Sequence, residues 1–144
     1  MGIARAESPQ DPSQVTYLLD TQAWVWWSID SSRLPAKTKR HLEAKTVDLI
    51  VSSISIVELG TLVAKGRIKL TIPFDDWVKR ATIAAGIRVI AVDEEIAKEA
   101  AQLPGGFHFE PADRIITATA RVKECTIVTA DESIQGYTHV KTIW

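Results

Sequence analysis

The chain has 144 residues, of which 46% are hydrophobic and 24% are charged, and its formal net charge is −1. This length suffices for one domain with a full hydrophobic core. The charge balance excludes an acidic tail or a basic coat for nucleic acid, so a polyanionic partner would require local positive charge or metal ions. No apolar run approaches the roughly 20 residues of a membrane span, and the N-terminus lacks a signal-peptide pattern.

The single cysteine, Cys125, excludes an internal disulfide. A lone thiol is typical of a reducing compartment, so we expect a cytoplasmic protein. Cys125 opens a strand-like run and no base is placed beside it. We therefore expect a buried structural thiol rather than a nucleophile.

The ordered domain is predicted to span residues 15–144, because residues 1–14 are polar, contain two prolines and lack periodicity, as in a disordered arm. Val15–Leu19 is a short apolar run suited to a central parallel strand. It ends at Asp20, and a helix begins at Thr21. Asp20 therefore lies at the carboxyl end of a strand, where open α/β sheets bind ligands. A simple helix cap is an equally good interpretation of Asp20.

Three tryptophans lie in this first predicted helix. Trp24 and Trp27 share one helical face, whereas Trp26 points elsewhere. We expect such aromatic side chains in the core or at a subunit interface, with stacking on nucleic-acid bases as the alternative. The next predicted helix, from Pro35 to about Ala44, contains the most basic segment of the chain, which is either a solvated face or a contact for a phosphate backbone.

The second predicted strand, Val47–Val51, leads into a helix that runs to about Lys65. Its expected inward stripe, at helical spacing, is formed by Ile54, Val57, Thr61 and Leu62. Glu58 falls on the same stripe. A carboxylate on a buried face is costly unless it is paired or binds a cation, so we interpret Glu58 as a functional residue.

Strands and helices alternate through the rest of the chain. This alternation predicts an α/β fold with five strands in a mainly parallel sheet and helices on both of its sides. His108 is expected in a loop, either solvated or near a substrate. The remaining predicted elements are helices over 73–85, 94–103 and 110–121 and strands over 87–92, 126–129 and 140–143.

The helix that starts at Glu110 and Pro111 has a proline in its first turn, where its missing N–H costs nothing. Its buried face is predicted from Ile115, Ile116, Thr119 and Ala120. Asp113 lies in the first turn, where the helix dipole favours a carboxylate. Taken alone, Asp113 would be an ordinary capping residue.

Four carboxylates now share a pattern. Asp20 and Asp131 end strands, Asp113 opens a helix, and Glu58 lies one turn into a helix that follows a strand. If all the strands are parallel, these side chains meet at one edge of the sheet, repel one another and raise their pKa values. Mg²⁺ or Mn²⁺ would remove that repulsion. Such a site suits metal-assisted hydrolysis of phosphodiesters, and the sequence has neither a His–Cys set for zinc nor a Gly-rich phosphate loop.

Five stretches of the sequence carry a resemblance to a known family: LLDTQAWVWW, SSISIVELGTLVAKGRIKL, EPADRIITATA, TIVTADESI and YTHVKTIW. In this order they resemble the PIN-domain toxins of the VapC family, over nearly everything from Val15 to Trp144. The resemblance implies a PIN-like α/β/α sandwich and a divalent-metal-dependent endoribonuclease, the toxin half of a type II toxin–antitoxin pair. It also implies a homodimer, and a cognate antitoxin that wraps the active-site groove, inserts a basic side chain among the acids and makes any contact with DNA.

By position, the resemblance assigns the acidic catalytic site to Asp20, Glu58, Asp113 and Asp131. Asp20 and Asp113 would be direct ligands of Mg²⁺ or Mn²⁺, and Glu58 and Asp131 would complete the coordination or hold metal-bound water. Thr129 matches the family's usual threonine, whose hydroxyl orients a neighbouring carboxylate.

The sequence departs from the family pattern at two positions. Gln22 stands where the family usually has histidine, and Glu110 stands where it usually has aspartate before the proline. Both departures leave the four acids intact, so they bear on substrate choice or on local hydrogen bonding.

Two other functions are compatible with parts of this pattern. One is a catalytically inactive PIN-like module that binds RNA or protein. The other is a phosphatase or a receiver-type phospho-aspartate domain, which also has an aspartate at a strand end. Those sites need a second acid beside the first or two residues after it, where this chain has Thr21 and Gln22.

Overall fold

The computed structural model describes residues 14–107 and 110–144. Its five strands form one sheet in the order β3-β2-β1-β4-β5, and all four pairings are parallel. The predicted five-stranded parallel sheet is therefore confirmed. The predicted disordered arm lies outside the described residues except for Gln14, and so does His108. The strands are β1 (Val15–Leu19), β2 (Val47–Ser52), β3 (Ile87–Ile90), β4 (Thr126–Val128) and β5 (Lys141–Ile143).

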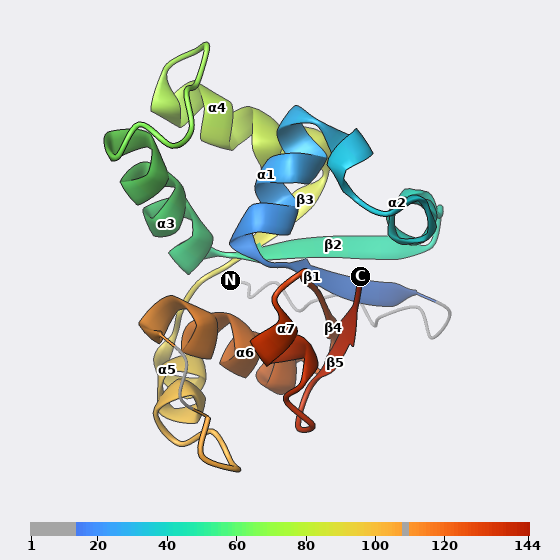
Figure 1. The fold of residues 1–144 in the computed structure, drawn as a ribbon, viewed down its shortest axis with the longest axis vertical. Coiled ribbons are helices and arrows are strands. Elements are labelled where there is room, and N and C mark those ends of the chain that lie inside the picture. Colours follow the sequence, from blue (N-terminus) through green and yellow to red (C-terminus); the bar gives the residue numbers. More distant parts are fainter. Residues whose placement is uncertain (1–13, 108–109) are drawn as a thin grey trace, which may run out of the picture.

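Helices cover both sides of the sheet, as predicted (Figure 1). Figure 1 shows α1 to α4 on one side and α5, α6 and α7 on the other. The helices are α1 (Thr21–Ile29), α2 (Ala36–Glu43), α3 (Ser53–Ala64), α4 (Phe74–Ala81), α5 (Glu94–Ala101), α6 (Pro111–Lys123) and α7 (Glu132–Gln135). Two short 3₁₀ turns, η1 (Ser31–Arg33) and η2 (Ile83–Ala85), were not predicted.

The central strand β1 explains why its sequence is continuously apolar. Successive side chains of a strand point to opposite faces. Leu19 packs with Trp24 and Leu59 on one side, and Leu18 packs with Ile116 and other buried residues on the other side. Both leucines are fully buried, as expected of a parallel strand covered on both faces.

The predicted helix over 73–85 is shorter in the structure. Thr82, with φ −124° and ψ −100°, leaves the helical conformation, and its hydroxyl donates a 2.7 Å hydrogen bond to the carbonyl of Val78. The chain then makes the turn η2 and reaches β3 through Gly86, whose φ of +74° is accessible mainly to glycine.

The prediction of the buried face of α3 was wrong for Val57 and Thr61, whereas its other two residues, Ile54 and Leu62, are half-buried. Val57 is 62% exposed and Thr61 is also exposed, whereas Ser55 and Leu59 are fully buried. Because α3 carries apolar residues on several sides, periodicity alone did not single out the face that packs on the rest of the domain. Glu58 is half-buried, between the two faces.

No helix among residues 14–107 and 110–144 is both long enough and apolar enough to cross a membrane.

The orientation of α3 gives a test by stability. Leu59→Ala should lower the free energy of unfolding by about 2–5 kcal/mol, because it leaves a cavity in the core. Val57→Ala should change it by less than about 1 kcal/mol, because Val57 is mostly in solvent. Urea denaturation measures both values, and equal losses would contradict this orientation of the helix.

Candidate active site

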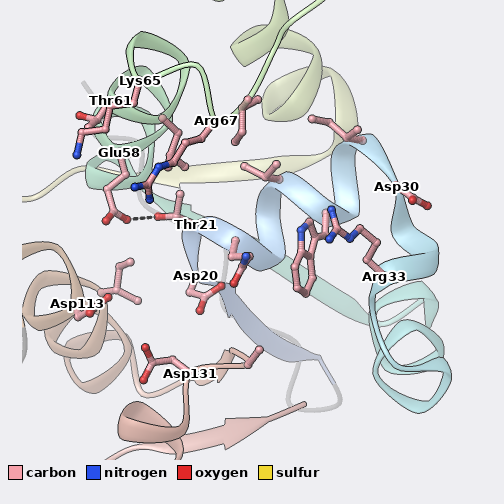
Figure 2. A pocket seen from close by; sticks show the side chains of 18 of the residues that line it. Asp20, Thr21, Asp30, Arg33, Glu58, Thr61, Lys65, Arg67, Asp113 and Asp131 are labelled. Atoms are coloured by element: carbon pink, nitrogen blue, oxygen red, sulfur yellow. Dashed lines mark hydrogen bonds between the residues drawn. The ribbon is translucent and has the colours of Figure 1, made fainter.

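A cleft of about 940 Å³ opens at the carboxyl edge of the sheet. Its lining comes from α1, η1, α3 and the segment that follows it, the start of α6, and the segment between β4 and α7. All four predicted acids line this one cleft: Asp20, Glu58, Asp113 and Asp131. Figure 2 shows their carboxylates around a common space. The structure thus brings together the residues that the sequence pattern selected, along with Gln22 and Glu110.

Asp20 is both a helix cap and a cleft residue. It follows β1 directly, and its Oδ1 accepts a 2.8 Å hydrogen bond from the Ala23 backbone N–H at the start of α1. Its side chain is nearly buried, with the residue 9% exposed. Because the cap uses Oδ1, the second carboxylate oxygen is left for other partners. Asp20 can therefore cap the helix and face a ligand in the cleft at the same time.

Asp131 has the same double position at the end of β4. Its Oδ1 accepts a 3.1 Å hydrogen bond from the Ile134 N–H and so caps α7. Thr129, which is fully buried, accepts a 3.0 Å hydrogen bond from the Asp131 N–H. The Thr129 side chain is also hydrogen-bonded to Asp20. Thr129 therefore connects two of the four acids, in line with the orienting role predicted for it.

Glu58 is held by hydroxyl groups that the sequence analysis did not identify. The hydroxyl of Thr21 donates a hydrogen bond to Glu58 Oε1, drawn as a dashed line in Figure 2. The hydroxyl oxygens of Thr21 and Ser55 are hydrogen-bonded to each other at 2.8 Å. The position of Thr21 directly after Asp20 was the available sequence signal for its role in the site. Its partner Glu58, on α3, is 37 residues away in the chain.

Asp113 is half-buried in the first turn of α6. Burial raises its pKa to about 6, and the charges of Asp131, Glu58, Asp20 and Glu110 add to that rise. Burial likewise raises the pKa of Asp20 to about 6. Hydrogen bonds from Thr129 and Ala23 oppose the rise for Asp20, whereas the charges of Asp131 and Glu58 strengthen it. Both aspartates thus experience the electrostatic strain expected of gathered carboxylates.

Positive side chains also line the cleft, and they are not those of the basic segment in the predicted helix from Pro35 to about Ala44. Arg33 comes from η1, and Lys65, Arg67 and Lys69 come from the segment after α3. No basic residue of α2 is among the lining residues. The sequence signal for Lys65, Arg67 and Lys69 was the KGRIK stretch at the end of the predicted helix.

The donor set suits a hard divalent cation, because it consists of carboxylate oxygens. Within residues 14–107 and 110–144, no group of three or more His, Cys, Asp and Glu side chains is arranged to hold a metal ion. Mg²⁺ commonly takes only one or two carboxylates and completes its shell with water and substrate phosphate. The raised pKa values of Asp20 and Asp113 are what a cation would reverse. The residues present therefore fit Mg²⁺ or Mn²⁺ bound through a small number of carboxylates.

Comparison with known proteins gives the same class of domain. The PIN domain family matches residues 17–139. Ribonuclease VapC22 of Mycobacterium tuberculosis (strain ATCC 25618 / H37Rv) is 34% identical over 131 residues, which cover 90% of this chain and 98% of that protein. The chain belongs to the PIN-domain family, and within it to the VapC proteins.

Solved structures share the fold at lower identity. VapBC2 from Rickettsia felis, bound to a DNA fragment from its promoter, superposes with a TM-score of 0.68 at 19% identity, over 90% of this chain and 98% of that one. DNA-bound VapBC from Salmonella typhimurium gives 0.65 at 17% identity, with the same coverage. The sarcin–ricin loop-cleaving toxin VapC20 from M. tuberculosis gives 0.56 at 17%, over 87% and 98% of the two chains.

The raised pKa of Asp20 predicts a pH-dependent cost of folding. The carboxyl group titrates at 3.8 without its environment and at about 6 in the folded protein. The buried Asp20 therefore does not lower the free energy of unfolding below about pH 4, where the carboxyl group is protonated. The free energy of unfolding falls as the pH rises from about 4 through 6. Asp20→Asn keeps a capping side chain and removes the charge. It should raise the free energy of unfolding of the metal-free protein at pH 8 by up to about 3 kcal/mol, with a gain that shrinks toward pH 4.

Urea denaturation in EDTA across this pH range measures the effect. Asp93→Asn is the matched control, because Asp93 caps α5 in the same way but lies outside the cleft. A loss of stability at pH 8 in Asp20→Asn would show that the cap, not the charge, dominates.

Proposed function

We propose that this protein is the toxin half of a type II toxin–antitoxin pair and acts as an Mg²⁺- or Mn²⁺-dependent endoribonuclease. The observation that carries the proposal is the meeting of Asp20, Glu58, Asp113 and Asp131, from four separate segments, in one cleft. RNA as the substrate is supported by the 34% identical ribonuclease VapC22.

Each acid has a distinct task in this proposal. Asp20 and Asp113 would hold the divalent cation, since both have pKa values that a nearby positive charge would lower. When bound, the cation supplies activation of water and neutralises charge on the scissile phosphate and the leaving oxygen. Glu58 and Asp131 would complete the set of four acids and orient water beside the phosphate.

Neighbouring hydroxyl groups keep these acids in position. Thr21 donates to Glu58 and contacts the buried Ser55, so the Glu58 side chain is held toward α1 rather than free in solvent. Thr129 contacts both Asp20 and the backbone of Asp131. These contacts limit how far the carboxylates can move apart under their own repulsion.

The substrate is expected to be single-stranded, such as an exposed loop, because the scissile phosphate must reach acids inside a cleft. Arg33, Lys65, Arg67 and Lys69 supply local positive charge in a chain with a net charge of only −1. Phosphates on either side of the cleaved bond can contact these side chains. RNA as the substrate also implies action in the cytoplasm.

The proposal includes protein partners. VapBC2 and the Salmonella VapBC are bound to DNA, and VapBC-5 from M. tuberculosis belongs to the VapBC family of toxin–antitoxin systems. By analogy, a cognate antitoxin would cover the cleft of this chain and make the DNA contact, and the chain itself would form a homodimer.

The rival function is a catalytically inactive PIN-like module that binds RNA or protein. The observation in its favour is that no three described acidic, His or Cys side chains are arranged to hold a metal ion. Titration of Mn²⁺ into the purified protein by calorimetry distinguishes the two functions. Binding that weakens in Asp20→Asn and Asp113→Asn supports the nuclease, whereas no binding supports the inert module.

Activity provides the direct test. Asp20→Asn and Asp113→Asn should each lower RNA cleavage in Mg²⁺ or Mn²⁺ by at least about a hundredfold, because each removes a charge from the proposed cation site. Gel analysis of a labelled RNA measures the rate, and circular dichroism checks the fold. Asp93→Asn, outside the cleft, is the control and should cleave as the wild type does. Unchanged cleavage in both site variants would dismiss this assignment.

Thr129 gives a subtler prediction. Thr129→Val keeps the volume of the buried side chain but removes the hydroxyl that lowers the pKa of Asp20. The pKa of Asp20 should therefore rise further, and Mn²⁺ affinity should fall more at pH 6 than at pH 8. Calorimetry at the two pH values measures the difference, and an equal loss at both would indicate a merely structural role.

A further inference from the structure

We propose that Trp26 and Arg33 form a stacking site for one unpaired base of the RNA, next to the acidic cluster. The proposal rests on the nuclease function proposed above and names how that function recognises its substrate. It assigns a task to the side chains of α1 and η1 that line the cleft but take no part in holding the cation.

One face of α1 and of the turn after it is turned toward the cleft. The lining residues Gln22, Val25, Trp26 and Ile29 recur at i, i+3, i+4 and i+7, which is one helical stripe. Arg33 continues this stripe into η1. The stripe starts two residues after Asp20, so it leads directly away from the acids. Figure 2 shows Arg33 at the opposite end of α1 from Asp20.

The aromatic member of this stripe is already paired with a planar cation. The Arg33 guanidinium carbon lies 4.8 Å from the centre of the Trp26 ring. The Trp26 ring also packs on Trp144, with ring centres 5.7 Å apart. Trp26 also packs against the core cluster that contains Trp24. The indole is therefore held in one orientation while it lines the cleft, which makes a rigid flat surface.

Arg33 forms no ion pair among the residues described, although, besides hydrogen bonds from Ser32, its charge helps to lower the pKa of Asp30. The acid of the same turn, Asp30, instead accepts hydrogen bonds from the hydroxyl and the N–H of Ser32. The guanidinium plane is thus available for stacking and for a phosphate, the two contacts that arginine makes to single-stranded nucleic acid.

Charge is separated along the cleft. In Figure 2 Arg33 lies toward the opposite end of α1 from the acids Asp20, Asp113 and Asp131, and Lys65 and Arg67 lie near Glu58 on the α3 side. A strand bound across the acids would therefore place flanking phosphates near cations at both ends. An acidic protein segment would contact the cations, and an apolar one would contact Ile29. Neither would stack on Trp26 and Arg33. The observations favour single-stranded RNA.

The test uses short single-stranded RNAs that are identical except for one nucleotide lacking its base, moved along the sequence. Binding is measured by fluorescence anisotropy in an Asp113→Asn background with Mg²⁺, so that the RNA stays intact. Removing the stacked base should weaken binding by about tenfold at one or two positions near the cleavage point. Trp26→Leu and Arg33→Ala should weaken binding of the intact RNA by a similar factor and no longer distinguish the abasic RNAs.

Matched variants separate stacking from charge and from folding. Trp26→Phe should recover part of the discrimination, and Arg33→Lys should keep the salt dependence but not the stacking. Arg67→Ala should weaken the binding of intact and abasic RNAs equally, as expected for a phosphate contact. Trp27→Leu and Arg80→Ala are controls, because neither residue lines the cleft.

The outcomes are distinct. Equal discrimination in wild type, Trp26→Leu and Arg33→Ala would overturn the stacking site while RNA cleavage by the wild type leaves the nuclease standing. If Trp26→Leu and Arg33→Ala bind RNA as the wild type does but are no longer inhibited by a co-expressed antitoxin, the stripe contacts a protein partner. That result would also overturn the stacking site. If the wild type neither cleaves nor binds RNA, the proposed function fails and the stacking site fails with it.

Discussion

Burial of carboxylates close to one another is the constraint on which the rest of this structure depends. Four acids line one cleft, and the two most affected, Asp20 and Asp113, have pKa values raised to about 6, first by burial and then by the charges of neighbouring acids. Such an arrangement lowers stability at neutral pH unless a cation compensates it. The fold supports it by a parallel sheet whose carboxyl edge collects the starts of several helices, a place where partial positive charge of helix N-termini favours carboxylates. The same gathered carboxylates therefore lower the stability of the protein and make the cleft suitable for a cation.

Structural and functional roles overlap in these residues. Asp20 and Asp131 cap helices with one oxygen and face the cleft, so neither role excludes the other. The hydroxyl groups of Thr21 and Thr129 link acids from distant segments. A site assembled in this way is rigid because its residues also hold the ends of the secondary structure elements. Proximity and orientation of such groups are what nuclease chemistry requires.

Much of the fold and of the site was predictable, for reasons visible in particular residues. The apolar run of β1 predicted a central strand, and the alternation of strands and helices predicted the sheet. The boundaries of elements were less accurate, as at Thr82, where one residue leaves the helical conformation. The buried face of α3 was predicted only in part, because apolar residues surround the helix and only contact with the rest of the domain determines which side is buried. Trp26 had been interpreted as a core or interface residue, with stacking on nucleic-acid bases as the alternative, and its position in the cleft became visible only in three dimensions.

The sequence by itself determined the class of fold, the family resemblance and the identity of the four acids, because these depend on local order: strand ends, helix starts and motif spacing. The tertiary structure alone decided which neutral and positive residues accompany the acids. Thr21 reaches Glu58 across 37 positions, and Arg33 joins Trp26 beside a cleft whose other wall comes from α3. Such partnerships depend on how helices pack on the sheet. Packing is set by the sum of many weak contacts over the whole chain, which no single stretch of sequence records.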